Sequence, residues 1–494
     1  MIMTLAQRTG FGGRILLLGC GSVSQCLQPL LLRRMDMSFD KLTVMDFEDL
    51  RDRIPGTLAA GARYVRHRIT PDNLASTLGE HLRAGDMLIN LTWNIGAEDI
   101  ISWCHDHGVL YLDTSVEQWD PYADMNVRHP TERTLYARHL ALRKMAAGWS
   151  DRGPTAIVEH GANPGLVSHW TKVALEDLAT AMLKSHSDLP EPLCAGRQAH
   201  LEQALHESDY ARLALETGTK VIHISERDTQ IGDRPKEVGE FVNTWSVEGF
   251  YEEGVAPAEL GWGTHEETLP PNAVVHGSGP GNQICLAQPG MTTWVRSWVP
   301  SSGPILGLLI RHGEAFTISD HLTVRQDGVA TYRPTVHYAY LPTDAAIASI
   351  HECWMHGFQL QEQQRIMTDE ITSGMDELGV LLLGHDLNGW WTGSQLTIEE
   401  TRALVPHQNA TTLQVAASVL AAVFSLVRHP SQGLCVPDDL DHREVLSAAA
   451  PYLGPSPSVR TDWTPTQTGR GPFDEFLGVR RPTDVWQFSN ILVS

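Results

Sequence analysis

The sequence contains few cysteines, and no two of them are spaced as a metal-binding or disulfide pair. Seven cysteines are scattered over 494 residues, and none belongs to a Cys-x-x-Cys motif. Disulfide-stabilised proteins and zinc sites both need cysteines in regular, closely spaced sets. We therefore expect no disulfide framework, no metal site and a location in the reducing cytoplasm.

Positive charge is also scarce. The chain has 37 Lys and Arg residues against 59 Asp and Glu residues, a formal net charge of −22. Binding to nucleic acid needs a clustered positive field, so this balance argues against a nucleic-acid partner. The acidic excess is compatible with a small cationic ligand, although acidity alone often serves solubility.

No hydrophobic run is long and pure enough to predict a membrane span. The most apolar stretch, residues 410–427, is interrupted by Thr411, Gln414 and Ser418, which is typical of a buried helix. The first residues also lack the basic-then-apolar pattern of a signal peptide. We expect a protein without a membrane partner.

Short apolar runs alternate with helical patterns in the first third of the chain. Strands are expected at 15–18, 42–45, 87–91 and 109–112, and helices at 98–107 and 137–149. Such alternation is typical of an α/β fold with a doubly wound parallel sheet of the Rossmann type. We expect residues 1–155 to form this first domain.

The pattern changes after residue 155. A buried strand at 156–159 leads into the turn GANPG and a helix through about residue 178; 185–197 is expected to be a surface loop. Further strands are expected at 221–225, 241–247, 292–299 and 305–310, and helices at 399–404 and 410–428. We predict a second, α+β domain over 156–400 with a largely antiparallel sheet, and a helix and loop-rich tail over 401–494 that packs back on the body.

A glycine-rich turn, GCGSVS, follows the first expected strand. Glycines allow the backbone to approach a pyrophosphate at a helix N-terminus, and Asp46 at the end of the second strand can accept hydrogen bonds from a ribose. An acid at this position favours NAD, but the nearby Arg51 and Arg53 could bind the 2′-phosphate of NADP, which remains an alternative. The motif is also incomplete, because Ser24 replaces its third glycine. A purely structural turn is the other alternative. The candidate cofactor contacts are Gly19, Gly21, Ser22, Val23, Asp46, Thr92, Thr114, Ser115 and Asn163.

Several long strings resemble bacterial homospermidine synthase, within the wider saccharopine-dehydrogenase-like group. They are HISERDTQ (223–230), FVNTWSVEGFYEEG (241–254), PAELGWGT (257–264), RPTVHYAY (333–340), DELGVLLLGH (376–385), NATTLQV (409–415), GANPGLVS (161–168), PYLGP (451–455) and TDWTP (461–465). The similarity runs from about residue 13 to the end. It implies a Rossmann domain joined to an α+β substrate domain, and a homodimer.

The resemblance implies a reaction without net redox change. NAD⁺ takes a hydride from the amine-bearing carbon of putrescine, or of an aminobutyl donor such as spermidine. The resulting imine exchanges its amine for a second putrescine, and the retained NADH reduces the new imine to homospermidine.

The same matching assigns candidate residues for a cationic substrate. Trp245 would cradle the cationic amine or imine by a cation–π contact, Glu226 would bind the amine at the reacting centre, Glu253 the far end of the substrate, and Glu117 would lie at the carboxyl edge of the sheet. For Trp245 the alternative is an ordinary core tryptophan, and for each acid it is a solvated surface position.

Four further residues complete the candidate set. Asn163 could reach the nicotinamide or the amine, or could only shape its turn. His312 could relay a proton, or could only satisfy a local hydrogen bond. Asp376 could line the pocket or begin a helix. Asn94 stands where the family pattern has Asp, which removes one negative charge from the expected cation-binding wall.

The sequence leaves two alternatives to the synthase reaction that the resemblance implies. A net dehydrogenase of the saccharopine or carboxynorspermidine type would need arginines for substrate carboxylates, and Arg227, Arg296, Arg311 and Arg333 are available. A non-catalytic polyamine- or NAD-binding protein is the second alternative.

Overall fold

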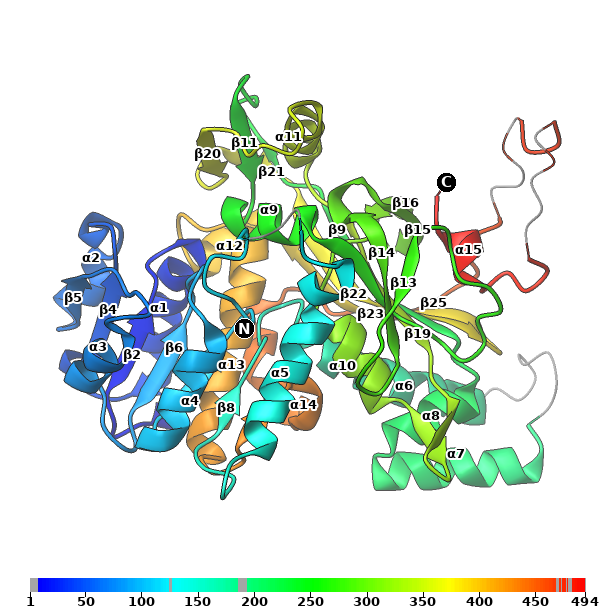
Figure 1. Ribbon diagram of the computed structural model, residues 1–494, viewed down its shortest axis with the longest axis horizontal. Coiled ribbons are helices and arrows are strands. Elements are labelled where there is room, and N and C mark those ends of the chain that lie inside the picture. The colour runs from blue at the N-terminus through cyan, green and yellow to red at the C-terminus, as the bar shows by residue number, and fades with distance from the viewer. Residues whose placement is uncertain are drawn as a thin grey trace.

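The chain folds around two β-sheets that meet along a shared core (Figure 1). The computed structural model describes residues 8–123, 127–184, 193–467, 471, 473–476, 478 and 482–493.

The first sheet is parallel throughout and has seven strands in the order β24-β8-β7-β6-β2-β4-β5. In that order the strands are Leu434–Cys435, Ala156–Ile157, Leu110–Asp113, Met87–Asn90, Ile15–Leu18, Leu42–Asp46 and Arg63–Arg66. This arrangement confirms the predicted Rossmann-type sheet.

Alternate residues of the central strand enter different halves of the core. Ile15 and Leu17 pack with helices α1 (Ser22–Arg34) and α13 (Ala410–Arg428), whereas Leu16 and Leu18 pack with α3 (Leu74–His81) and α4 (Ala97–His107). Burial on both faces explains why the strand reads as a continuous apolar run.

The last part of the chain returns to the first sheet. Strand β24 extends the sheet beside β8, and α13 packs against both α1 and strand β7. By length and composition α13 could cross a membrane, but 89% of its apolar window is buried inside the molecule. It is therefore a core helix that joins the two sheets.

The second sheet has ten strands, with the path β13-β14-β12-β19-β9-β22-β23-β25 and a β15–β16 hairpin attached to β19. Among the described strands of this sheet, β9 and β19 form the parallel pair and the other pairs are antiparallel. The strands are β9 Val221–Asp228, β12 Pro257–Gly261, β13 Ala273–Val275, β14 Gln283–Pro289, β15 Trp294–Val299, β16 Gly303–Leu308, β19 Thr335–Leu341, β22 Met375–His385, β23 Asn388–Thr397 and β25 Ser458–Thr461. The remaining elements include α5 Leu135–Ala147, α6 Leu166–Lys184, α8 Tyr210–Thr217, α10 Glu314–His321, α11 Asp344–Met355, α12 Ile398–Leu404, α14 His442–Ala449, α15 Phe488–Ile491, and the short strands β10 Ile231–Gly232, β20 Gln363–Ile366 and β21 Ile371–Ser373.

The prediction of a strand over 241–247 is wrong for the second half of that range. Strand β11 covers only Glu240–Asn243, and helix α9 (Val247–Val255) begins directly afterwards. The Ser246 hydroxyl accepts a hydrogen bond from the Gly249 N–H at 3.0 Å, so a serine N-cap starts the helix inside an apolar run. The loop expected over 185–197 lies outside the described residues up to 192, and helix α7 (Ala195–Glu207) begins within its last part.

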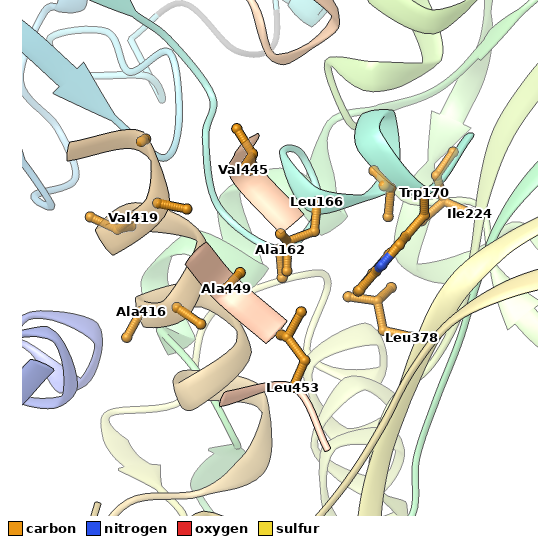
Figure 2. Close-up of a cluster of buried hydrophobic side chains, with 14 of the residues drawn as sticks. Ala162, Leu166, Trp170, Ile224, Leu378, Ala416, Val419, Val445, Ala449 and Leu453 are labelled. Atoms are coloured by element: carbon orange, nitrogen blue, oxygen red, sulfur yellow. The ribbon is translucent and has the colours of Figure 1, made fainter. Parts of the chain in front are cut away.

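Helix α6 ties the two sheets together. Figure 2 shows its residues Leu166 and Trp170 in one cluster with Val419 of α13 and with Ile224 and Leu378 of the second sheet. The GANPG turn that precedes α6 is therefore held at the junction of the two sheets.

Candidate active site

The candidate cofactor residues follow the carboxyl ends of neighbouring parallel strands. The turn after β2 carries Gly19, β4 ends at Asp46, Thr92 follows β6, and Thr114 and Ser115 follow β7. Because these strands are parallel, the loops after them share one edge of the sheet, which is where nucleotides bind in such folds.

The glycine turn leaves room for a phosphate. Gly19 has φ +89°, and a Cβ there would lie 2.7 Å from the carbonyl oxygen of Leu91, so only glycine fits. Gly21 is the N-cap of α1, has no capping side chain, and would meet nothing within 4 Å if it carried a Cβ. The N–H groups of the first turn, at Ser22 and Val23, are thus available to an anion.

Asp46 is fixed beside this turn. Its carboxylate accepts hydrogen bonds from the Cys20 N–H at 2.7 Å and the Glu48 N–H at 2.9 Å. The guanidinium of Arg51 is paired with Asp49 at 2.6 Å. This arrangement suits a ribose hydroxyl better than a 2′-phosphate.

Three carboxyl groups from two strands of the second sheet lie together in the interior. Glu226 and Asp228 are two residues apart on β9 and so face the same side, and Asp376 of β22 pairs directly with Asp228. All three residues are at most 2% exposed. We call them the acid cluster.

The three acids differ in their partners. Asp228 accepts hydrogen bonds from the Thr244 hydroxyl at 2.7 Å and the Gln230 N–H at 2.9 Å. Neither carboxyl oxygen of Asp376 has a hydrogen bond of ordinary geometry among the described residues, although the Thr411 hydroxyl is near enough to lower its pKa against the effect of burial. Asp376 also lies inside a strand, so the alternative that it begins a helix is wrong.

Burial and mutual repulsion dominate the electrostatics of the acid cluster. Burial, reinforced by the Asp228 carboxylate, raises the pKa of Glu226 to about 7, against the opposing hydrogen bond from Tyr338. Burial and the charges of Glu226 and Asp228 raise the pKa of Asp376 well above its usual range. A cation among these groups would relieve both effects.

Asn163 connects this cluster to the first sheet. Its side-chain N–H donates to Glu226 Oε2 at 3.0 Å, and the Tyr338 hydroxyl donates to the same oxygen. Asn163 belongs to the turn after β8, on the same sheet edge as the glycine turn. The acid cluster therefore meets the nucleotide-binding edge through one amide side chain.

Aromatic side chains adjoin the cluster. The Trp245 Nε1–H donates to the Tyr340 hydroxyl at 3.2 Å, and the rings of Tyr338 and Tyr340 stack with centroids 5.2 Å apart. The charges of Glu226, Asp228 and Asp376 all act on Tyr340 and, after burial, raise the pKa of its hydroxyl.

His312 lies between two carboxylates. Its Nε2 is 3.2 Å from Glu253 Oε2, and its Nδ1 is 3.2 Å from Glu314 Oε1. Burial opposes protonation, but these two carboxylates outweigh it and raise the pKa of His312 well above its ordinary value. The centroids of the His312 and Tyr338 rings are 4.4 Å apart. Because Tyr338 donates a hydrogen bond to Glu226, His312 and its two carboxylates adjoin the acid cluster.

Glu117 and Asn94 belong to a different neighbourhood. Glu117 accepts a hydrogen bond from Ser115 at 2.8 Å, and burial together with the nearby Glu252 carboxylate raises its pKa to about 7. The Asn94 side-chain oxygen accepts the Asp120 N–H at 2.6 Å and so holds a loop. In the described part of the chain, neither side chain forms a hydrogen bond or an ion pair with the acid cluster.

Sequence reasoning did not single out Asp228, Glu314, Tyr338 or Tyr340. The two tyrosines alternate in the string HYAY on a buried strand, a spacing that places them on one face. Asp228 stands two residues after Glu226, so the same rule could have found it.

The chain is similar to known proteins over most of its length. Residues 15–157 match the family described as Saccharopine dehydrogenase NADP binding domain, and residues 161–455 match Saccharopine dehydrogenase C-terminal domain. The homospermidine synthase of Blastochloris viridis is 42% identical over 97% of both chains, and that of Mesorhizobium japonicum is 39% identical over 97% of this chain and 96% of its own.

The chain belongs to the homospermidine synthase family. A solved homospermidine synthase from Legionella pneumophila, in complex with NAD, is 35% identical, covers 99% of both chains and superposes with a TM-score of 0.86. These homospermidine synthases confirm the family resemblance and the saccharopine-dehydrogenase-like fold predicted from the sequence.

Proposed function

We propose that this enzyme joins two putrescine molecules to form homospermidine and release ammonia, with a retained NAD as hydride carrier; spermidine is the alternative aminobutyl donor. The observation that carries the proposal is the acid cluster: three buried carboxyls, one without a hydrogen bond of ordinary geometry in the described structure, next to a nucleotide-binding edge. A dication such as putrescine supplies the missing positive charge.

The residues of the nucleotide-binding edge fit NAD. The uncapped start of α1 would receive the pyrophosphate, Asp46 the ribose, and Thr92, Thr114 and Ser115 lie along the same edge. When bound, NAD takes a hydride from the substrate carbon and later returns it to the carbon of the new bond. Asn163 holds Glu226 at this edge, so the amine bound by Glu226 lies near the nicotinamide.

Glu226 is suited to remove the proton that must leave an ammonium group before hydride transfer. A carboxyl group with a pKa of about 7 can both accept and release a proton near neutral pH. Trp245 and the tyrosines offer aromatic faces to the cationic amine or imine, and the His312–Glu253 pair lies on the side of Tyr338 to receive the far end of the substrate. We further propose that Glu117 lies on the approach of the substrate and that Asn94 only shapes its loop.

The arginines that a carboxylate-binding dehydrogenase would need are engaged elsewhere. Arg227 pairs with Asp344, Arg296 donates to the carbonyl groups of Asn490 and Leu492, and Arg333 donates to that of Trp262. Arg311 is neutralised by the buried Glu252. Arg227 also donates to the backbone carbonyl of Asp228 at 2.9 Å. Among the described residues, Arg227, Arg311 and Arg333 form no ion pair with a carboxyl group of the acid cluster, which favours a diamine over a substrate that bears carboxylates.

The decisive experiment separates transfer from net oxidation. Purified enzyme is incubated with putrescine deuterated on both amine-bearing carbons and with a trace of NAD, and products are followed by mass spectrometry and absorbance of NADH. We expect homospermidine and ammonia, full retention of deuterium, and no accumulation of NADH. Formation of NADH in proportion to product would establish the dehydrogenase instead.

The cellular location and the oligomeric state of the enzyme are proposals, the first from its scattered cysteines and the second from the family resemblance. We propose that the enzyme acts in the cytoplasm, where putrescine and reduced cysteines coexist, and that it forms a homodimer. The domain division at residues 155 and 400 also remains our proposal, with the return of β24 and α13 to the first sheet as an added link.

A further inference from the structure

A second cluster of charged residues adjoins the His312–Glu253 pair. In this cluster arginines outnumber acids, whereas acids outnumber cations around His312. Adjacent residues form both: Glu253 of α9 contacts His312, while its neighbour Glu252 contacts Arg311. Arg138 of α5 binds the same Glu252 carboxylate at 2.6 Å. Together with Arg133 these residues line a small cavity that opens to solvent.

The interior of this cavity has more guanidinium groups than carboxylates to neutralise them. Burial alone would raise the pKa of Glu252, but Arg311 and Arg138 outweigh it and lower the pKa to about 2, so Glu252 is ionised. Among the described buried and half-buried residues that line the cavity it is the one carboxylate beside Arg133, Arg138 and Arg311. Outside the lining, Glu117, Glu253 and Glu259 also act on Arg311, so Arg133 is the arginine whose charge is least balanced. At the exposed rim, Arg128 and Glu132 carry opposite charges and cancel.

Two of the arginines have unused binding capacity. Arg311 is 2% exposed, and its Nε has no hydrogen-bond partner among the described residues. Arg133 has a single side-chain hydrogen bond in the described structure, to the Val255 carbonyl at 3.4 Å. Burial and the charge of Arg311 lower the pKa of Arg133, so its cation is destabilised where it stands.

We propose that this cavity, lined by Arg133, Arg138 and Arg311 beside Glu252, is a binding site for a small oxyanion. Guanidinium groups bind planar carboxylates and tetrahedral phosphates through paired hydrogen bonds, and both ligands share this chemistry. An anion here supplies the missing negative charge to Arg133 and a partner to the Nε of Arg311. The site rejects putrescine, because a dication would meet the arginines directly.

The test is a titration of the NAD-loaded enzyme, so that the nucleotide site is already filled. Inorganic phosphate in one arm and acetate in the other are added at constant ionic strength, and the thermal midpoint is followed. We expect a saturable rise with at least one anion. A response to phosphate alone identifies a tetrahedral dianion site, and a response to acetate alone identifies a carboxylate site.

Arg133→Gln is the key variant because Arg133 has no ion pair in the described structure and its loss leaves the Glu252 pairs in place. The half-saturating concentration should rise at least tenfold in Arg133→Gln and to a lesser extent in Arg133→Lys. Arg460→Gln, on β25, removes an exposed arginine elsewhere and should behave like the parent. Equal responses of Arg133→Gln and parent, or no saturable response to either anion, would overturn the proposal. Because the readout needs no turnover, it is independent of the proposed synthase activity.

Discussion

The buried acid Glu252 and the three buried acids of the acid cluster differ in how their charge is balanced. Glu252 is enclosed by two guanidiniums and has a pKa of about 2, whereas the carboxyl groups of Glu226, Asp228 and Asp376 form no ion pair with a cationic side chain among the described residues and have raised pKa values. A carboxylate that is neutralised internally supports the fold. Carboxylates that are left without a cation indicate a ligand that brings one.

The strongest test of this contrast is Glu252→Gln. Removing the carboxylate leaves two buried guanidiniums uncompensated, so the free energy of unfolding should fall by about 3–5 kcal/mol. Urea denaturation of parent and variant at the same pH measures this difference in the free energy of unfolding. An unchanged midpoint would show that the pair of arginines does not depend on Glu252.

The matched substitution Glu226→Gln should affect function instead. Loss of the ammonium partner should lower kcat/KM for putrescine by about 100-fold or more, because a buried charge pair loses one member. Stability without substrate should stay the same or increase, since a repelling carboxylate is removed. NAD affinity, measured by fluorescence, is the control and should not change. If putrescine binds Glu226→Gln as tightly as the parent, Glu226 is not the amine partner.

Replacement of the indole should have a smaller effect than removal of the acid. Trp245→Ala should reduce turnover by about 3- to 30-fold, the range of a cation–π contact, with NAD binding intact. Trp245→Phe should recover part of the loss. Trp354→Ala, which removes a half-exposed tryptophan on α11, is the comparison variant. Kinetics equal to the parent would remove Trp245 from the mechanism.

The pH dependence gives the smallest and most specific signal. The pKa of Glu226 is about 7 in the folded chain and near 4.5 when unperturbed, so between these values the folded state binds more protons than the unfolded state. The free energy of unfolding of the substrate-free enzyme should therefore decrease as pH rises from 4.5 to 7 and then level off. Putrescine binding should strengthen over the same window as Glu226 ionises. In Glu226→Gln both slopes should become shallower; identical pH profiles for parent and variant would contradict the raised pKa.

Much of the fold follows from the sequence because burial imposes clear patterns. The run at 15–18 has no polar residue since both of its faces are covered, and the alternation of strands and helices defines the Rossmann sheet. Prediction fails where a local signal competes with hydrophobicity, as at Ser246, where an N-cap begins a helix inside an apparent strand. It also fails where pairing is distant, since nothing local to residues 434–435 indicates that they join β8.

The candidate site was predicted unevenly for a similar reason. Family strings identify Glu226 and Asn163, whereas His312 is a candidate only as a residue that could relay a proton; the structure brings these three together through Tyr338. Tyr338 itself reads as an ordinary core residue, because its role depends on which strand lies beside β9. The charge state of Asp376 depends on acids of another strand and cannot be read from its own neighbours.

The return of the last hundred residues to the first sheet has a consequence for how this enzyme matures. The nucleotide-binding half receives an outer strand, β24, and a large apolar surface, α13, from residues that the ribosome makes more than 250 residues after β8. Until then the newly made N-terminal half exposes the edge of β8 and the side of α1 that α13 later covers. The first sheet is thus complete only after residue 435 has been made, and a fragment that ends before α13 would expose an aggregation-prone surface.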